Sequence, residues 1–113
     1  MLNTNLKHLM TKSDLQQLID TQEKVAVVCG RMGPMCVPVY KIFEMFEEKY
    51  PDVAFRDMEF DTPEAAAIRG LPECRSFQGL PFTVYYRNGK VVKATSSIQT
   101  TDQVKWIISE VFA

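Results

Sequence analysis

The stretch GLPFTVYYRNGKVVKA, residues 79–94, determines the fold more than any other part of the sequence. Two runs rich in β-branched and aromatic residues, Phe82 to Tyr86 and Val91 to Ala94, flank the dipeptide Asn88-Gly89. An Asn-Gly pair between two such runs is the strongest short-range signal for a β-hairpin, because both residues accept the positive φ angles of a tight turn. Pro81 fits this hairpin, since proline is tolerated at the start of a strand. The segment therefore predicts two antiparallel strands.

Upstream of the hairpin, the hydrophobic pattern predicts alternating strands and helices. The continuous apolar run Val25 to Cys29 is typical of a strand buried on both faces of a sheet. An amphipathic helix follows from Val39 to Tyr50, and Pro51 ends it. The other expected segments are a weak strand over 6–10, a helix capped by Ser13 and ending near residue 21, a strand over 53–60, a short helix from Thr62 to Gly70, an irregular link over 71–80, and a last helix capped by Thr100 or Thr101. This order predicts one α/β domain over residues 1–113, with a central mixed sheet and helices on both faces.

Composition and charge exclude several classes of function. Hydrophobic residues make up 46% of the chain and charged residues 24%, which is typical of a globular protein. The formal net charge is -1 and the Lys and Arg residues are scattered, so we expect no nucleic-acid or membrane partner. Met1 to Thr11 contains no apolar run long enough for a signal peptide. The three cysteines are an odd number without regular spacing, which does not indicate a disulfide framework. We therefore expect the protein in the cytoplasm. We expect no metal or cofactor, interpret the lone His8 as a surface residue, and take a monomer as the default.

Four parts of the sequence resemble the thioredoxin family, and together they span residues 6–113. The strand Val25 to Val28 runs into a loop with Gly33-Pro34 at the start of the long helix, where the family has Trp-Cys-Gly-Pro-Cys. Phe60 to Pro63 is similar to the family's strand end, and Gly79 to Lys90 is similar to its Gly-Ile-Pro-Thr run and Asn-Gly hairpin. The C-terminal amphipathic helix is the fourth part. The resemblance implies a thioredoxin-like fold in an atypical protein, because the Cys-x-x-Cys pair of the family is missing.

The loop from Met32 to Cys36 aligns with the family motif in two ways. Matching the apolar face of the helix places Cys36 on the second cysteine of the family and Gly33 on the first. Matching Gly-Pro to Gly-Pro instead places Met32 and Met35 on the two cysteines. Neither alignment contains a dithiol, and the strand Val25 to Val28 also lacks the buried aspartate of the family.

The resemblance makes Cys36 the candidate catalytic thiol and Cys74 a tentative resolving cysteine. Cys36 lies two residues before Pro38, next to a helix N-terminus whose unpaired N–H groups, together with nearby Arg31, favour a thiolate. The competing interpretation is an inert thiol packed under the loop. Cys74 lies in a polar, turn-like segment, so we expect it to be partly exposed, and it is either a partner that forms a disulfide with Cys36 or an incidental loop cysteine. Cys29 ends a buried strand and is interpreted as a core residue.

Two functions of different classes follow from these residues. The first is a thiol–disulfide redox protein of cell redox homeostasis, acting on protein thiols or disulfides through Cys36, with Cys74 or glutathione closing the cycle. The second is a non-catalytic adaptor that docks a partner peptide in the groove of the family. Cys36, Pro81 and Cys74 favour the first function, whereas loss of the dithiol and of the buried aspartate favours the second. We predict the first and keep the adaptor as the alternative. The resemblance also implies a cis bond between Leu80 and Pro81. The residues expected to bind the substrate or partner are Met32, Gly33, Pro34, Met35, Leu80, Pro81 and Ile98.

Overall fold

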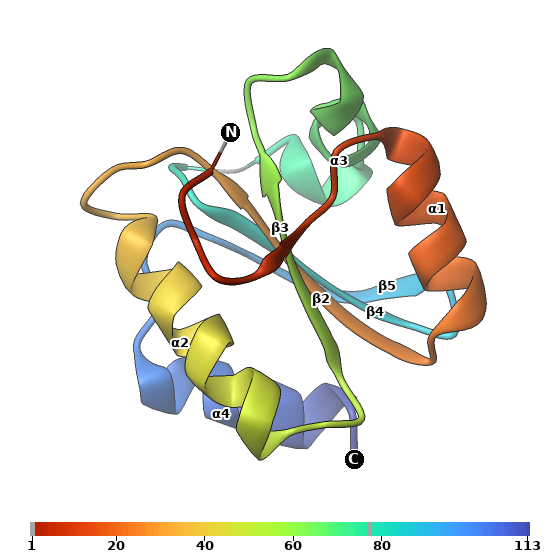
Figure 1. Ribbon diagram of the computed structural model, residues 1–113, viewed down its shortest axis with the longest axis vertical. Helices are drawn as coiled ribbons and strands as arrows, with labels where there is room; N and C mark the ends of the chain where they lie inside the picture. Colours follow the sequence, from red (N-terminus) through yellow and green to blue (C-terminus); the bar gives the residue numbers. More distant parts are fainter. Residues whose placement is uncertain (1, 77) are drawn as a thin grey trace.

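The computed structural model describes residues 2–76 and 78–113 as an α/β fold built on a five-stranded sheet (Figure 1). The strand order is β1-β3-β2-β4-β5, in which β3 is parallel to β1 and β2, and β4 is antiparallel to β2 and β5. The strands are β1 Lys7–His8, β2 Lys24–Gly30, β3 Ala54–Glu59, β4 Phe82–Arg87 and β5 Lys90–Ser96. The prediction of a mixed sheet is confirmed.

Helices cover both faces of the sheet, as the order of elements predicts. Helices α2 and α4 lie on one face, and α1 and α3 lie on the other (Figure 1). The helices are α1 Lys12–Thr21, α2 Val37–Lys49, α3 Ala66–Arg69 and α4 Thr101–Val111, with short 3₁₀ turns η1 at Pro63–Ala65 and η2 at Pro72–Cys74. Each face has its own cluster of buried apolar side chains. We call them the α2/α4 core, which contains Phe43 and Phe55, and the α1/α3 core, which contains Leu15 and Met58.

Strand β2 is the central strand and is buried along most of its length. Val25 to Cys29 have no exposed surface, and the strand pairs with β3 on one side and β4 on the other. Because successive side chains of a strand point to opposite faces, Ala26 and Val28 enter the α2/α4 core, whereas Val27 and Cys29 enter the α1/α3 core. Burial on both faces explains why this run contains no polar residue.

Aromatic rings fill the α2/α4 core. The ring of Phe43 in α2 packs edge-on against Phe55 of β3, with the ring centroids 5.0 Å apart, and against Tyr85 of β4, with the centroids 6.5 Å apart. Tyr85 in turn contacts the ring of Phe112 near the end of the chain, at 6.2 Å. These contacts hold α2 in a fixed position over the centre of the sheet.

The turn and cap residues agree with the sequence pattern at all but one position. Asn88 and Gly89 adopt positive φ angles of 53° and 81° in the hairpin turn. Thr100 caps α4, which was one of the two expected caps. Helix α1 differs from the expectation, because Thr11 caps it and Ser13 lies inside the first turn. Thr11 is the N-cap because its hydroxyl accepts a hydrogen bond from the backbone N–H group of Asp14 in the first helical turn.

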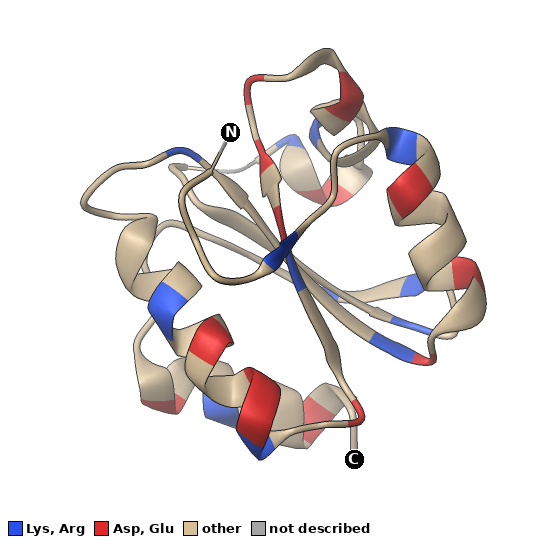
Figure 2. Cartoon of the chain, in the orientation of Figure 1, with Lys and Arg blue, Asp and Glu red and all other residues tan. Residues whose placement is uncertain are grey.

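Figure 2 shows both charge signs on helices α1, α2 and α4, and a run of acidic residues along the end of β3 and the loop that follows it. Among the helices that the structure describes, none has the length and apolar character needed to cross a membrane.

Candidate functional site

Cys36 lies at the N-terminal end of α2 as its N-cap residue. The loop before it closes into a tight turn, because the N–H groups of Cys36 and Val37 both donate to the carbonyl oxygen of Gly33, at 3.1 and 3.0 Å. Pro38 follows in the first turn of the helix, where a missing N–H group leaves no hydrogen bond unmade. The predicted position of Cys36 at the start of the long helix is therefore confirmed.

The Cys36 thiol is packed inside the protein. The residue is 3% exposed, and its Sγ accepts a hydrogen bond from the N–H group of Arg31 at 3.5 Å. Gly30 at the end of β2 makes this packing possible. A Cβ atom at position 30 would lie 2.7 Å from Tyr40 Oη, 2.9 Å from Cys36 Sγ and 3.2 Å from Pro81 Cβ. The side chains of Tyr40, Cys36 and Pro81 therefore occupy the space that a side chain at position 30 would need.

An open groove of about 440 Å³ lies beside this thiol, and we call it the Cys36 groove. Its apolar lining comes from Pro34, Met35, Phe60 and Leu80. Cys36 is the single cysteine among the described residues that line it. The loop before α2, the residue after β3 and the segment before β4 meet here, although they are far apart in the sequence. An open, mostly apolar groove of this size is suited to an apolar ligand.

The structure brings together most of the residues that the sequence assigned to substrate or partner binding. Those that line the Cys36 groove are Gly33, Pro34, Met35 and Leu80. Met32 and Ile98 are exposed but do not line the groove. Pro81 is buried next to Gly30, and the peptide bond before it is cis. Sequence reasoning missed the contributions of Phe60 and Gly79 to the groove, although both residues begin segments that resemble the family.

The one cation that lines the groove is already paired within the part of the chain that the structure describes. The guanidinium of Arg31 donates to both carboxylate oxygens of Asp61, from Nε at 2.6 Å and from Nη2 at 2.8 Å. These hydrogen bonds hold the pKa of Asp61 below its ordinary value. The same guanidinium lies 6.0 Å from the ring centroid of Phe60. Arg31 therefore approaches Cys36 through its backbone N–H group, while its charge is directed to Asp61.

The other two cysteines lie on the opposite face of the sheet from Cys36. Cys29 and Cys74 belong to the α1/α3 core, whereas Cys36 belongs to the α2/α4 core, and all three thiols are free. Burial raises the pKa of Cys29 to about 12, and burial also raises the pKa of Cys74. The expectation of a partly exposed Cys74 is wrong, because the η2 turn packs this residue inward until 4% of it is exposed. The structure thus brings Cys74 toward Cys29 rather than toward Cys36.

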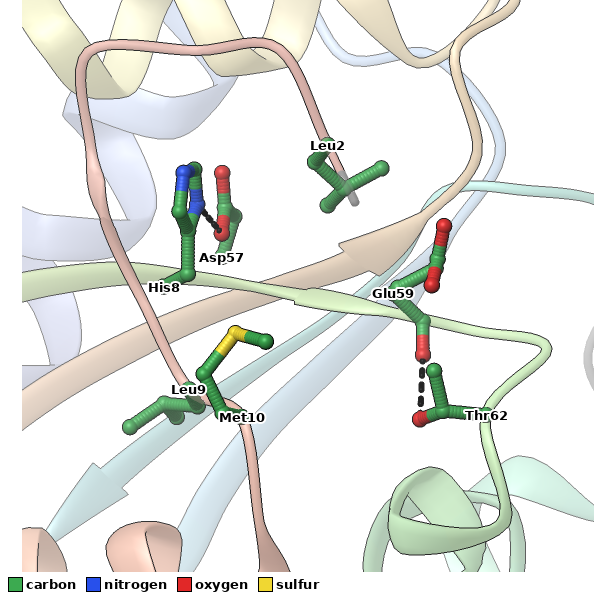
Figure 3. A pocket seen from close by; sticks show the side chains of 7 residues that line it. All are labelled: Leu2, His8, Leu9, Met10, Asp57, Glu59 and Thr62. Atoms are coloured by element: carbon green, nitrogen blue, oxygen red, sulfur yellow. Dashed lines mark hydrogen bonds and ion pairs between the residues drawn. The ribbon is translucent and has the colours of Figure 1, made fainter.

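The side chains of His8 and Asp57 form a hydrogen-bonded pair beneath the N-terminal segment (Figure 3). The Asp57 side chain has no exposed surface; its Oδ1 lies 2.6 Å from His8 Nδ1, and its Oδ2 accepts a hydrogen bond from the Thr4 hydroxyl. Burial raises the pKa of Asp57, and the two hydrogen bonds oppose that rise. The interpretation of His8 as an ordinary surface residue is wrong, because β1 aligns it with Asp57 of β3. The adjacent cavity of about 30 Å³ has room for a single water molecule, so the pair fastens the N-terminal segment to the sheet rather than lining a ligand site.

Solved structures identify the fold. No protein-family model and no curated protein matches the sequence. Thioredoxin from Plasmodium falciparum superposes with a TM-score of 0.76 at 19% identity, covering 94% of this chain and 99% of that chain. Mitochondrial thioredoxin 3 from Saccharomyces cerevisiae gives a TM-score of 0.76 at 19% identity, covering 94% and 95%. Thioredoxin from Malassezia sympodialis gives 0.77 at 14% identity, covering 100% and 96%. The chain has the thioredoxin fold.

Within this thioredoxin fold, the buried face of α2 favours one of the two sequence alignments. Val39, Tyr40, Ile42, Phe43 and Phe46 are all buried, as the alignment of Cys36 with the second cysteine of the family requires. In that alignment Cys36 corresponds to the second cysteine of the family. Gly33 corresponds to the first cysteine; it lines the groove and carries no thiol.

Replacing Gly30 with alanine tests the packing around Cys36. We expect Gly30→Ala to lower the free energy of unfolding by about 1–3 kcal/mol, because the new Cβ atom would overlap Tyr40 Oη and Cys36 Sγ. Gly33→Ala is the matched control: a Cβ atom there meets nothing within 4 Å, so its effect should stay within about 0.5 kcal/mol. Urea denaturation of both variants measures the difference. Equal stability of the two variants would refute the close approach at Gly30.

The titration of Asp57 gives a second test. Burial raises the pKa of Asp57 in the folded state above its ordinary value of 3.8. Protonated Asp57 therefore contributes fully to the free energy of unfolding below pH 3.8, and this contribution is lost as the pH rises through the raised pKa. Across this acidic range, the free energy of unfolding of the wild type should therefore fall with pH relative to Asp57→Asn.

Asp61→Asn is the control for this titration. The pKa of Asp61 is lowered, so its contribution is present above 3.8 and is lost as pH falls through the lowered pKa. The wild type should gain stability with pH relative to this variant, with a small amplitude because the Arg31–Asp61 pair is exposed. Urea denaturation at several acidic pH values gives both slopes, and equal signs would contradict the assignment.

Proposed function

We propose that this chain binds an extended, apolar segment of a partner protein in the Cys36 groove. The observation that carries the proposal is an open, apolar groove whose single cysteine is almost completely buried. Exposed apolar surface in a concave site favours binding, since a ligand with apolar side chains removes that surface from water. Binding of a peptide therefore needs no reactive group.

The charges around the groove indicate the chemistry of the partner segment. Arg31 is neutralised by Asp61, so the groove offers no unpaired cation to an acidic ligand. The remaining side chains that line it are apolar, apart from the Cys36 thiol. The segment that fits best is uncharged at its centre and carries at least one apolar side chain toward Met35 and Leu80.

The arrangement of the cysteines weighs against exchange by an internal dithiol. Thiol–disulfide exchange requires an accessible thiolate and a resolving thiol that reaches the mixed disulfide. Cys36 is 3% exposed, and Cys74 lies in the core on the other face of the sheet. A disulfide between them would require one of the two residues to leave its core.

Single-thiol exchange is the second candidate function, favoured by the position of Cys36 at the helix start inside the groove. In that reaction the Cys36 thiolate, having lost its proton to solvent, attacks one sulfur of a protein disulfide. The protein disulfide breaks, a mixed disulfide with Cys36 forms, and the other sulfur leaves as a thiolate. A glutathione thiolate then attacks the partner's sulfur of the mixed disulfide, and Cys36 leaves as a thiolate. A second glutathione attacks the resulting partner–glutathione disulfide, which releases the reduced partner and oxidised glutathione. Three free cysteines are in keeping with the reducing cytoplasm proposed as its compartment.

Peptide binding to groove variants tests the main proposal. Peptides selected from a random library on the wild-type protein should shift the NMR signals of Met35, Phe60 and Leu80. We expect Leu80→Glu to weaken their binding at least tenfold, because it places a charge in the apolar lining. Trp106→Glu is the control, since Trp106 is 62% exposed on α4 and does not line the groove. Equal binding by both variants would place the docking surface elsewhere.

Cys36→Ser separates the two candidate functions. The binding function predicts that this variant binds the selected peptides within about twofold of the wild type, because a buried hydroxyl of similar shape preserves the groove. It also predicts that the wild type does not accelerate reduction of a peptide disulfide by glutathione. Acceleration by the wild type that Cys36→Ser abolishes would instead establish the exchange reaction.

A further inference from the structure

Four methionines are exposed among the residues that the structure describes. They are Met10, Met32, Met35 and Met45, with exposed fractions of 55, 48, 43 and 52%. Two of them flank Gly33-Pro34 in the loop that shapes the Cys36 groove. A thioether exposed to solvent can be oxidised by peroxide, whereas a buried one such as that of Met58, which is 1% exposed, is protected.

Met35 differs from the other exposed methionines because it lines the groove. Met32, its neighbour in the loop, points its sulfur to the N-terminal segment, where Sδ accepts the N–H group of Asn3 at 3.3 Å. Among the described residues, no hydrogen bond of this kind engages the sulfur of Met35. Met35 therefore lies in the apolar lining and, unlike Met32, has a sulfur that accepts no such hydrogen bond from the described residues.

We propose that Met35 is a peroxide-sensitive modification site, and that its oxidation to the sulfoxide releases the partner segment from the Cys36 groove. The inference rests on the proposed function, since it assigns a regulation to the same groove. In the reaction, hydrogen peroxide is the oxidant: its O–O bond breaks, one oxygen atom bonds to Sδ, and the other leaves as water. The sulfur loses two electrons and the peroxide gains them. A methionine sulfoxide reductase, supplied with a dithiol reductant, returns the sulfoxide to the thioether: the dithiol is oxidised to a disulfide and the oxygen leaves as water.

The chemistry of the lining explains why one oxygen atom has a large effect. Pro34, Phe60 and Leu80 line the groove with Met35 and have no side-chain hydrogen-bond donor, and the guanidinium of Arg31 is engaged by Asp61. A bound apolar segment would bury the S=O dipole without a partner, which is unfavourable. We therefore expect oxidised protein to bind about tenfold more weakly.

The first arm of the experiment locates the modification without any ligand. The purified protein is treated with a low concentration of hydrogen peroxide, and sulfoxides are mapped over time by mass spectrometry of proteolytic peptides. Met35 should oxidise several-fold faster than Met32 and much faster than Met58. A rate at Met35 equal to or below that at Met32 would overturn the assignment, whatever the groove binds.

The second arm measures the consequence with the library-selected peptides. Peroxide-treated wild type should lose about tenfold in affinity, and methionine sulfoxide reductase should restore it. Met35→Leu should bind equally before and after treatment. Met45→Leu is the matched control, because it removes an exposed methionine outside the groove and should leave the protein as sensitive as the wild type. Loss of affinity by treated Met35→Leu would assign the effect to another residue, including the Cys36 thiol.

The two arms separate failure of this inference from failure of the proposed function. If untreated wild type binds no peptide at the groove, the proposed function is wrong. The claim that oxidation of Met35 releases a bound segment is then wrong as well. If untreated protein binds and fully oxidised Met35 leaves the affinity unchanged, the proposed function stands and the inference is wrong.

Discussion

The burial of strand β2 between β3 and β4 is the constraint on which the site depends. Because Val25 to Cys29 contact a helical layer on both faces, the strand can neither shift its register nor tilt without exposing one of the two cores. Its last residue, Gly30, is consequently held in a fixed position at the C-terminal end of the central strand. The loop before α2 and the Leu80-Pro81 segment pack against that place, and the Cys36 groove forms between them.

Within this frame, the thioredoxin fold is preserved while the residues at its helix start differ from the family motif. Where Cys36 is aligned with the second cysteine of the family, Gly33 stands in place of the first, and Arg31 beside the thiol pairs with Asp61. The groove has an apolar lining and a single buried thiol. In the proposed function, recognition of a segment therefore does not depend on a dithiol.

Much of the fold could be predicted from the sequence because its signals are local. The apolar run at Val25, the Asn88-Gly89 turn and the periodicity of α2 each depend on neighbours within a few residues, and each is confirmed. The errors concern contacts between distant segments. His8 pairs with a residue 49 positions away, and nothing near His8 in the sequence announces a buried carboxylate. Cys74 lies in a polar segment, but a single 3₁₀ turn rotates it inward.

The same division applies to the site. Cys36, Gly33 and Leu80 were placed in the groove through a resemblance of motifs, which fixes positions along the chain. Which cysteine faces which core depends instead on the alternation of side chains along β2 and on the path of the 71–80 link. Those are properties of three-dimensional packing, so the sequence left the pairing of the cysteines open.

The hydrogen bonds of Asp57 make the first few residues of the chain part of its core. Thr4 and His8 supply both partners of a carboxylate that no solvent reaches, and Leu2 and Leu6 are buried as well. Proteolytic trimming past His8 would leave that carboxylate without partners in an apolar setting, at a cost of about 3–5 kcal/mol. This segment, whose strand signal in the sequence is weak, is therefore a structural requirement of the sheet, and its detachment would start unfolding at β3.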